Sequence, residues 1–219
     1  MMLRFSKRLL TIAALSCLAV PSCASGPAQA ELPASCKAPE YPLNAVKNSA
    51  SGISRVGFLI RPDGTVARWI LLNSSGSADL DNAARAALSE CVFERMAGSI
   101  GELWREVDYV WYLGDAGLVE ATQAAARSAK GGNLNARYHL SLLLSTSAKS
   151  DAEREQALLV LRSAAELGHA HAQFDLARRY ERGQGMPADL DEALRWYRKS
   201  AGQGDPLAIQ RVELGRLIN

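Results

Sequence analysis

The chain has 219 residues, with 25 basic and 23 acidic side chains and a formal net charge of +2. Lysine and arginine alternate with aspartate and glutamate along the predicted helices and form no dense basic stripe, which argues against a nucleic-acid partner. Without the first 30 residues the balance is 22 basic to 23 acidic, or −1, which strengthens that exclusion.

The first 30 residues have the composition of an export signal. Three basic residues precede an apolar run at 9–20, and small residues follow it up to Ala30. We expect cleavage after Ala30 and a periplasmic mature chain. A rival signal would place a lipid on Cys23, although Pro21 is awkward so close to a modified cysteine. The apolar run is shorter than the about 20 residues that a membrane-spanning helix needs, and no second candidate span follows.

Two of the four cysteines, Cys36 and Cys91, lie beyond this leader. Export to an oxidising compartment favours a disulfide between them. A metal site is not expected, because neither cysteine has a histidine or a second cysteine at ligand spacing.

The segment up to residue 114 predicts a small α+β domain. Strand-like runs at 53–60 and 65–73 flank a Pro-Asp-Gly turn, which predicts a hairpin. Apolar residues at helical spacing then predict one helix over 80–91, with Ser77 or Asp79 as its N-cap. The residues from Trp104 to Leu113 alternate between apolar and polar, as in a strand with one buried face.

The order of short motifs in this segment resembles the TonB C-terminal domain. The motifs are Tyr41-Pro42, Asp63-Gly64, Ser74-Ser75-Gly76, Leu80-Asp81, Ala84 and Phe93. The chain departs from the family at Arg95, where a proline is usual, and lacks the membrane helix and long proline-rich span of energy-transducing TonB proteins. The resemblance implies an antiparallel sheet with a helix, and a domain that accepts an extended peptide, such as an outer-membrane receptor segment, at the edge beside its last strand.

The predicted peptide-binding edge is therefore the strand at 104–113. Its backbone would pair with the partner, and its candidate site residues are Trp104, Glu106, Asp108, Val110 and Tyr112. Of these, Glu106, Asp108 and Val110 are expected to point outward and to determine which peptide is accepted. The alternative is that the aromatic residues of the strand only fill the core beneath the helix.

From residue 115 onward the sequence repeats with a period of 36 residues. Glycines recur at 132, 168 and 204, and alanines recur at 136, 172 and 208 with the same step. Such a period in a helical composition predicts a solenoid of helical hairpins. We expect helices near 117–130, 133–146, 152–167, 169–182, 189–202 and 205–217. The predicted domains are accordingly a signal peptide at 1–30, the α+β domain at 31–114 and the repeats at 115–219.

The unit at 169–204 resembles the Sel-one-like repeat, a relative of the tetratricopeptide repeat. The preceding unit has Ser147 and Lys149 where Gly183 and Gly185 stand, so we expect a longer or strained loop there. The resemblance implies scaffolding of a second protein. The candidate residues of the concave surface are Arg137, His139, Gln173 and Arg178, with ordinary solvated positions as the alternative.

The sequence predicts no catalytic, cofactor-binding or metal-binding residues. His169 and His171 are two residues apart, so they point to different helix faces and are expected to be surface histidines. The Gly183-Gln184-Gly185 run lacks phosphate-binding spacing. A cell-wall or β-lactam-directed hydrolase is a distant alternative, since the repeats carry no paired cysteines and the chain has no Ser-x-x-Lys motif.

Two non-enzymatic hypotheses remain. The first is a periplasmic adaptor that binds a peptide at the sheet edge and a second protein on the repeats. The second is a stand-alone envelope assembly or stress factor that uses only its repeats. The first requires pairable backbone along Trp104–Leu113, whereas the second allows the solenoid to cover that edge.

Overall fold

The computed structural model describes residues 36–93 and 101–218, so the expected cleavage after Ala30 and the alternative lipid on Cys23 lie outside the described residues. Within those ranges the chain forms three strands and eight helices. They are α1 (Leu43–Lys47), β1 (Gly52–Ile60), β2 (Val66–Asn73), α2 (Ala78–Ser89), β3 (Leu103–Trp111), α3 (Gly114–Lys130), α4 (Leu134–Ser147), α5 (Asp151–Glu166), α6 (Ala170–Arg182), α7 (Leu190–Gly202) and α8 (Pro206–Ile218).

The strands form an antiparallel sheet in the order β2-β1-β3. β1 is the central strand, and all nine of its residues are buried. The hairpin between β1 and β2 is closed by a hydrogen bond from Gly64 N to Arg61 O at 2.9 Å. Gly64 has a φ of 90°, a backbone conformation that glycine adopts without steric cost. The predicted hairpin is thus confirmed, with β1 one residue longer and β2 one residue shorter than expected.

One face of the sheet packs against α2. The alternating residues Val107, Tyr109 and Trp111 of β3 face this side and are buried, as the sequence predicts, whereas Leu113, expected on the same side, lies beyond the end of β3 and is 40% exposed. The three buried residues join an apolar core of side chains from α2 and β1, namely Val56, Phe58, Ile60, Leu80, Ala84 and Leu88. The predicted disulfide between Cys36 and Cys91 closes the edge of this core, with a Cα–Cα distance of 4.7 Å.

The helices from α3 onward form successive hairpins, and their bounds lie within three residues of those predicted. Ala172 and Ala208, which share the 36-residue period, are both fully buried where neighbouring helices pack.

The expectation of a longer or strained loop after α4 is wrong. Only residues 148–150 separate α4 from α5, whereas residues 183–189 separate α6 from α7. The shorter link contains no left-handed residue. α5 starts early, at Asp151, and the side chain of its N-cap, Ser150, forms a capping box with Glu153.

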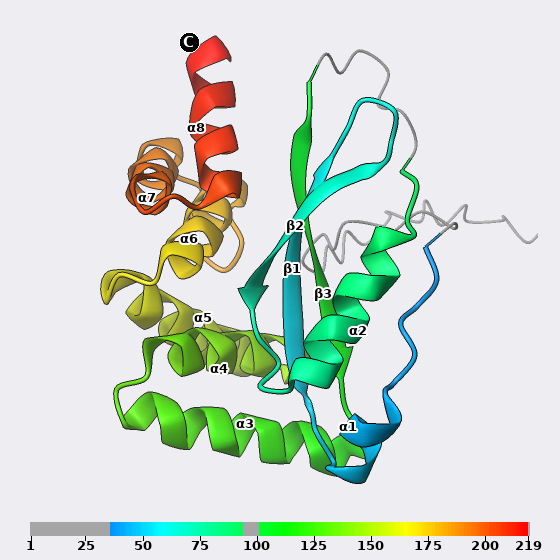
Figure 1. Ribbon diagram of the computed structural model, residues 1–219. Helices are drawn as coiled ribbons and strands as arrows, with labels where there is room; N and C mark the ends of the chain where they lie inside the picture. The colour runs from blue at the N-terminus through cyan, green and yellow to red at the C-terminus, as the bar shows by residue number, and fades with distance from the viewer. Residues whose placement is uncertain (1–35, 94–100, 219) are drawn as a thin grey trace, which may run out of the picture.

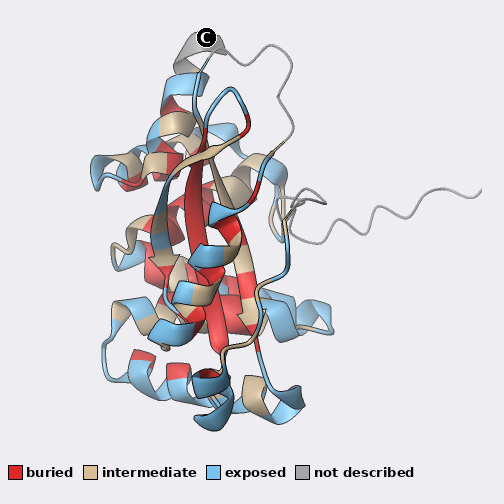
Figure 2. Ribbon diagram, turned by 45° about the vertical axis from the view of Figure 1, so that its right-hand side comes forward, coloured by how far each residue is buried: buried red, intermediate tan, exposed pale blue. Residues whose placement is uncertain are grey.

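The repeats pack against the second face of the sheet, so the sheet lies between α2 and the helical array (Figure 1). Ile53 of β1 belongs to the core of the repeats, and Leu72, Trp104 and Val110 pack against it. The central strand β1 consequently runs through the buried centre of the molecule, whereas most residues of β2 are of intermediate burial or exposed (Figure 2). The description of β3 as a strand with one buried face therefore needs correction, because both of its faces are covered by this chain.

No helix of the described residues is long and apolar enough to cross a membrane.

Candidate functional site

Arg55 of β1 lies at the centre of the interface between the sheet and the repeats, and its side chain is only 7% exposed. Its guanidinium donates to both carboxylate oxygens of Asp108 on β3, from Nε at 2.5 Å and from Nη2 at 2.6 Å. Its Nη1 donates to Asp175 of α6 at 2.5 Å and to the hydroxyl of Tyr138 on α4 at 2.6 Å. One arginine therefore connects the sheet to two helices of the repeats.

A second set of ion pairs surrounds Glu106 of β3. Its carboxylate accepts hydrogen bonds from Arg178 of α6 and, at 2.8 Å, from Nε2 of His171. The other ring nitrogen of His171 lies 2.7 Å from Asp205, which precedes α8. Arg178 also pairs with Asp175 at 2.8 Å, which joins the two sets into one network.

Glu106, Asp175 and His171 of this network are held in their charged forms at neutral pH. Burial opposes protonation of His171, but its hydrogen bonds with Asp205 and Glu106 outweigh burial and raise its pKa to about 9. Burial also opposes ionisation of Glu106, yet Arg178 and Arg55 hold its pKa well below the ordinary value. Opposite charges therefore join the sheet to the repeats, and losing one of them would weaken the pairing of its buried partners.

Glu106, His171 and Asp175 bring possible metal-ligand atoms within 4.8 Å of one another. Both ring nitrogens of His171 already bond to carboxylates, and a pKa of about 9 means that a metal ion would have to displace a tightly held proton. Both carboxylates also pair with arginines. The donor set fits an internal ion-pair network rather than a metal centre.

The predicted residues of the concave surface lie on or near this interface. Arg178 pairs with the sheet residue Glu106, and Nδ1 of His139 lies 2.8 Å from the amide nitrogen of Asn73 on β2. Gln173 is buried and donates to the carbonyl of Ala165 within the repeats. Arg137 also bonds within the repeats, to Ser163 Oγ and to Ala129 O. The chain's own sheet therefore occupies the surface that Arg178 and His139 were expected to offer to a second protein.

The predicted edge-strand residues occupy two environments. Glu106 and Asp108 point toward the repeats and take part in the ion-pair network, and Trp104 and Val110 pack against the repeat core. Tyr112 follows the end of β3 and is 50% exposed. The expectation that Glu106, Asp108 and Val110 point outward is wrong, because the repeats cover that face. Selection of a peptide by Glu106 or Asp108 would require their ion pairs to break.

β3 lies at the edge of the sheet among the described strands, as the sequence predicts, but the outer backbone groups of its second residue, Trp104, are already paired. The amide nitrogen of Trp104 donates to Oε1 of Gln210 on α8 at 2.6 Å, and Nε2 of Gln210 donates to the carbonyl of Trp104 at 3.3 Å. The carboxamide of Gln210 thus pairs with one residue of β3 as a peptide group of an added strand would. In an antiparallel strand the backbone groups of every second residue share a direction, so those of Glu106, Asp108 and Val110 also face away from β1.

Several residues of the interface were not identified from the sequence. Arg55 is a charged residue inside an apolar strand, and that position was a usable signal of a buried ion pair. The expectation that His171 is a surface histidine is wrong, since its side chain is 4% exposed. Asp175, Asp205 and Gln210 are polar residues on amphipathic segments, and no local pattern distinguishes them from solvated positions.

Comparison with known proteins matches two parts of the chain. Residues 37–101 match the family model for the C-terminal region of Gram-negative bacterial TonB proteins, and residues 170–205 match the Sel1 repeat. The chain therefore joins a segment similar to the TonB C-terminal domain to a segment similar to the Sel1 repeat, and the two similarities support a protein-interaction role in general. The first match ends before β3 begins at Leu103, and the second covers α6 and α7.

Two solved structures show partial similarity. A protective antigen of uropathogenic Escherichia coli with an SLR fold is 29% identical, with a TM-score of 0.39, over 42% of this chain and 20% of its own. A Sel1 repeat protein from Oxalobacter formigenes is 24% identical, with a TM-score of 0.41, over 44% of this chain and 40% of its own. The chain thus spans well under half the length of either structure. A search of curated proteins found no match.

Proposed function

We propose that this protein is a non-enzymatic periplasmic adaptor that receives an extended segment of a partner protein by strand addition at β3. The proposal rests on the pairing of Gln210 with Trp104. A side-chain amide already bonds to the outer backbone groups of β3, so this edge accepts amide partners. A partner strand would continue from that position along Glu106, Asp108 and Val110.

Most of the specificity for the partner peptide would come from its backbone register on β3 and from side chains that take no part in the ion pairs. Glu106 and Asp108 are held by arginines, so they would contribute fixed charge rather than adaptable contacts. Tyr112 is half exposed at the end of the strand and is the side chain best placed to contact the partner. An outer-membrane receptor segment is one partner of this kind.

The second protein of the adaptor would bind the outer surface of the repeats, because the sheet occupies the side lined by Arg178 and His139. The rival function, an envelope assembly or stress factor acting through its repeats alone, is favoured by the same covering of the sheet. The two functions differ in whether β3 binds a peptide.

The test begins with a pull-down from periplasmic extract, after which peptides from the captured proteins are titrated calorimetrically. Val110→Pro removes a backbone donor from the edge and should weaken binding at least tenfold. Val110→Ala is the matched control, because it shortens the side chain but keeps the donor. Gln210→Ala frees Trp104 and should leave affinity unchanged or increase it. Equal binding by the wild type and a folded Val110→Pro variant would contradict the proposal and favour the rival.

A further inference from the structure

A cavity of about 100 Å³ lies beside β3, between this strand and the second halves of α4 and α6. The strand contributes Glu106–Asp108 and Val110 to its lining, and the helices contribute polar and charged side chains, among them Arg178 and Arg179. Small-molecule sites usually have a volume of at least about 300 Å³. The cavity therefore has the size for one side chain of a partner protein rather than for a free ligand.

Arg179 is an arginine of this cavity without a counter-charge in contact. Arg55 and Arg178 also line the cavity, but both pair with carboxylates of the ion-pair network. Arg179 is partly buried, and within the part of the chain that the structure describes its guanidinium forms no ion pair or hydrogen bond. Burial opposes the charge of all three arginines. Carboxylates outweigh burial at Arg55 and Arg178 and raise their pKa, whereas burial lowers the pKa of Arg179.

A strand added to β3 would direct side chains into this cavity. The outward backbone groups of β3 belong to Glu106, Asp108 and Val110, and the side chains of the same residues point toward the repeats. Residues directly opposite each other on neighbouring strands share one face of the sheet, with Cβ atoms about 4.5–5.5 Å apart. Every second side chain of the partner would therefore lie beside these three residues, which line the cavity.

We propose, on the basis of the strand addition proposed above, that the partner strand carries an acidic residue on this face and that its carboxylate pairs with Arg179. The planar guanidinium matches a carboxylate with two parallel hydrogen bonds. Like charges directly opposite each other destabilise a sheet, so the acidic residue would lie opposite Val110 rather than opposite Glu106 or Asp108. Arg179 would repel a basic side chain, and an uncharged one would leave the guanidinium without an ion pair.

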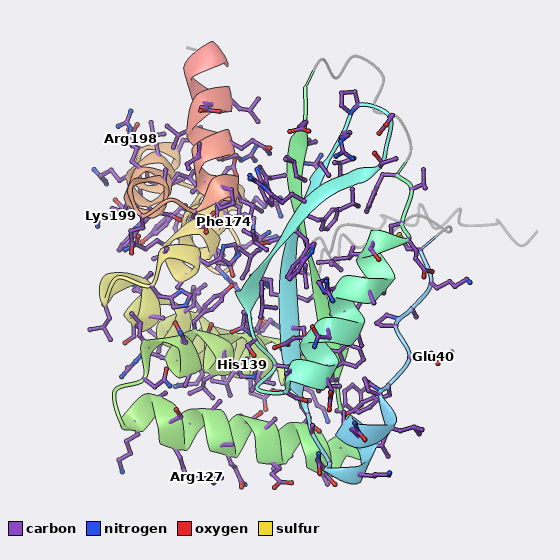
Figure 3. The ribbon with its side chains drawn as sticks, in the orientation of Figure 1. Glu40, Arg127, His139, Phe174, Arg198 and Lys199 are labelled. Atoms are coloured by element: carbon purple, nitrogen blue, oxygen red, sulfur yellow. A yellow bond between two sulfur atoms is a disulfide. The ribbon has the colours of Figure 1, made fainter. Side chains whose placement is uncertain are left out.

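The experiment is a titration of the isotope-labelled protein with blocked heptapeptides, followed by NMR. The peptides alternate valine and threonine, and their central residue is glutamate, glutamine or lysine. Arg179→Gln removes the charge from the cavity. Arg198→Gln is the matched control, because it removes the same charge from an exposed position of α7, which Figure 3 shows on the side of the repeats away from the sheet.

We expect the glutamate peptide to shift the resonances of β3 and Arg179. It should bind the wild type about tenfold more tightly than the glutamine peptide, because hydrogen bonds between charged groups are stronger than those to neutral ones. This preference should disappear in Arg179→Gln and persist in Arg198→Gln. Arg179→Lys keeps the charge and should retain part of the preference, which a purely structural role of Arg179 does not predict.

The wild type alone can overturn the inference, whether or not Arg179→Gln folds. Equal binding of the glutamate and glutamine peptides, or tighter binding of the lysine peptide, would refute the pairing with Arg179. So would a preference for glutamate that survives in Arg179→Gln. If Val110→Pro still weakens all three peptides in these cases, strand addition at β3 stands without the acidic residue. Binding that Val110→Pro leaves unchanged, or no shift in β3 with any peptide, would count against strand addition itself and overturn this inference with it.

Discussion

The two faces of the sheet differ in that the repeat face combines apolar packing with a network of ion pairs, whereas the core on the α2 face is apolar. On the α2 face, Val107, Tyr109 and Trp111 join a continuous apolar core, and a disulfide closes its edge. On the repeat face, Glu106 and Asp108 of the same strand meet arginines and a histidine. Apolar burial tolerates many arrangements of similar volume, whereas ion pairs require one set of partners. The apolar face therefore stabilises the domain, and the ionic face fixes how the repeats dock on it.

The sharpest test of this comparison is Arg55→Leu. The substitution removes the arginine that Asp108 and the buried Asp175 share and leaves Arg178 as the remaining partner of Asp175, so we expect the free energy of unfolding to fall by about 3–5 kcal/mol. Urea denaturation followed by circular dichroism measures it. Adding Asp108→Asn and Asp175→Asn should restore much of the loss, because no uncompensated charge then remains. A loss of less than 1 kcal/mol for Arg55→Leu alone would show that the network is solvated.

The disulfide tests the apolar face. Replacing Cys36 and Cys91 with serine removes the cross-link from the unfolded chain, so we expect a loss of about 2–4 kcal/mol. We expect the repeats to stay docked on the sheet in this variant, because no residue of the ionic network is altered. Thiol alkylation of the denatured, unreduced wild type is the control. Full labelling of both cysteines would show that the bridge is absent.

The residues on the two faces also differ in how far the sequence predicts them. Period-two alternation correctly places Val107, Tyr109 and Trp111 inside, and the 36-residue period places the helices of the repeats within a few residues. The same alternation marks Glu106 and Asp108 only as polar, because a polar side chain on a strand faces either water or buried charges.

Long-range partners explain the rest of what the sequence did not predict. Gln210 bonds to Trp104 across 106 positions, and Arg55 bonds to Asp175 across 120. No local periodicity encodes such distances. Only the unusual position of Arg55 within an apolar strand indicated that a buried partner must exist.

The dependence of stability on pH distinguishes the ionic face from the apolar one. The pKa of His171 is raised from its ordinary value of 6.5 to about 9, so its stabilisation is complete below pH 6.5 and is lost as the pH rises through 9. At 1.36 kcal/mol per pKa unit this amounts to about 3 kcal/mol. The pKa of Glu106 and that of Asp175 are lowered, so their stabilisation exists above their ordinary values and is lost as the pH falls through the folded ones.

The measurement is the urea midpoint at pH values from 5 to 10, for the wild type and for His171→Gln. The groups that face His171 are the carboxylates of Glu106, Asp205 and Asp175, the Tyr138 ring and the neutral His169. The wild type should lose stability between pH 6.5 and 9, and the variant should show a flatter profile over that range. Parallel profiles would mean that His171 does not carry the effect.

The smallest expected effect tests the apolar packing between neighbouring helices of the repeats. Ala172 is fully buried at the start of α6, where its position in the 36-residue period matches Ala208 of α8. Ala172→Leu adds volume where neighbouring helices already touch, so we expect a loss of about 1–3 kcal/mol. Ala126→Leu, on an exposed position of α3, is the matched control and should change stability by less than about 0.5 kcal/mol.

Because His171 and Asp175 flank Ala172 on the same helix, overpacking there should also shift α6 relative to the sheet. If the stability of Ala172→Leu depends less on pH than that of the wild type, the ion pairs of the repeat face depend on how the helices beneath them are packed. An unchanged urea midpoint would show that the site accommodates leucine without strain.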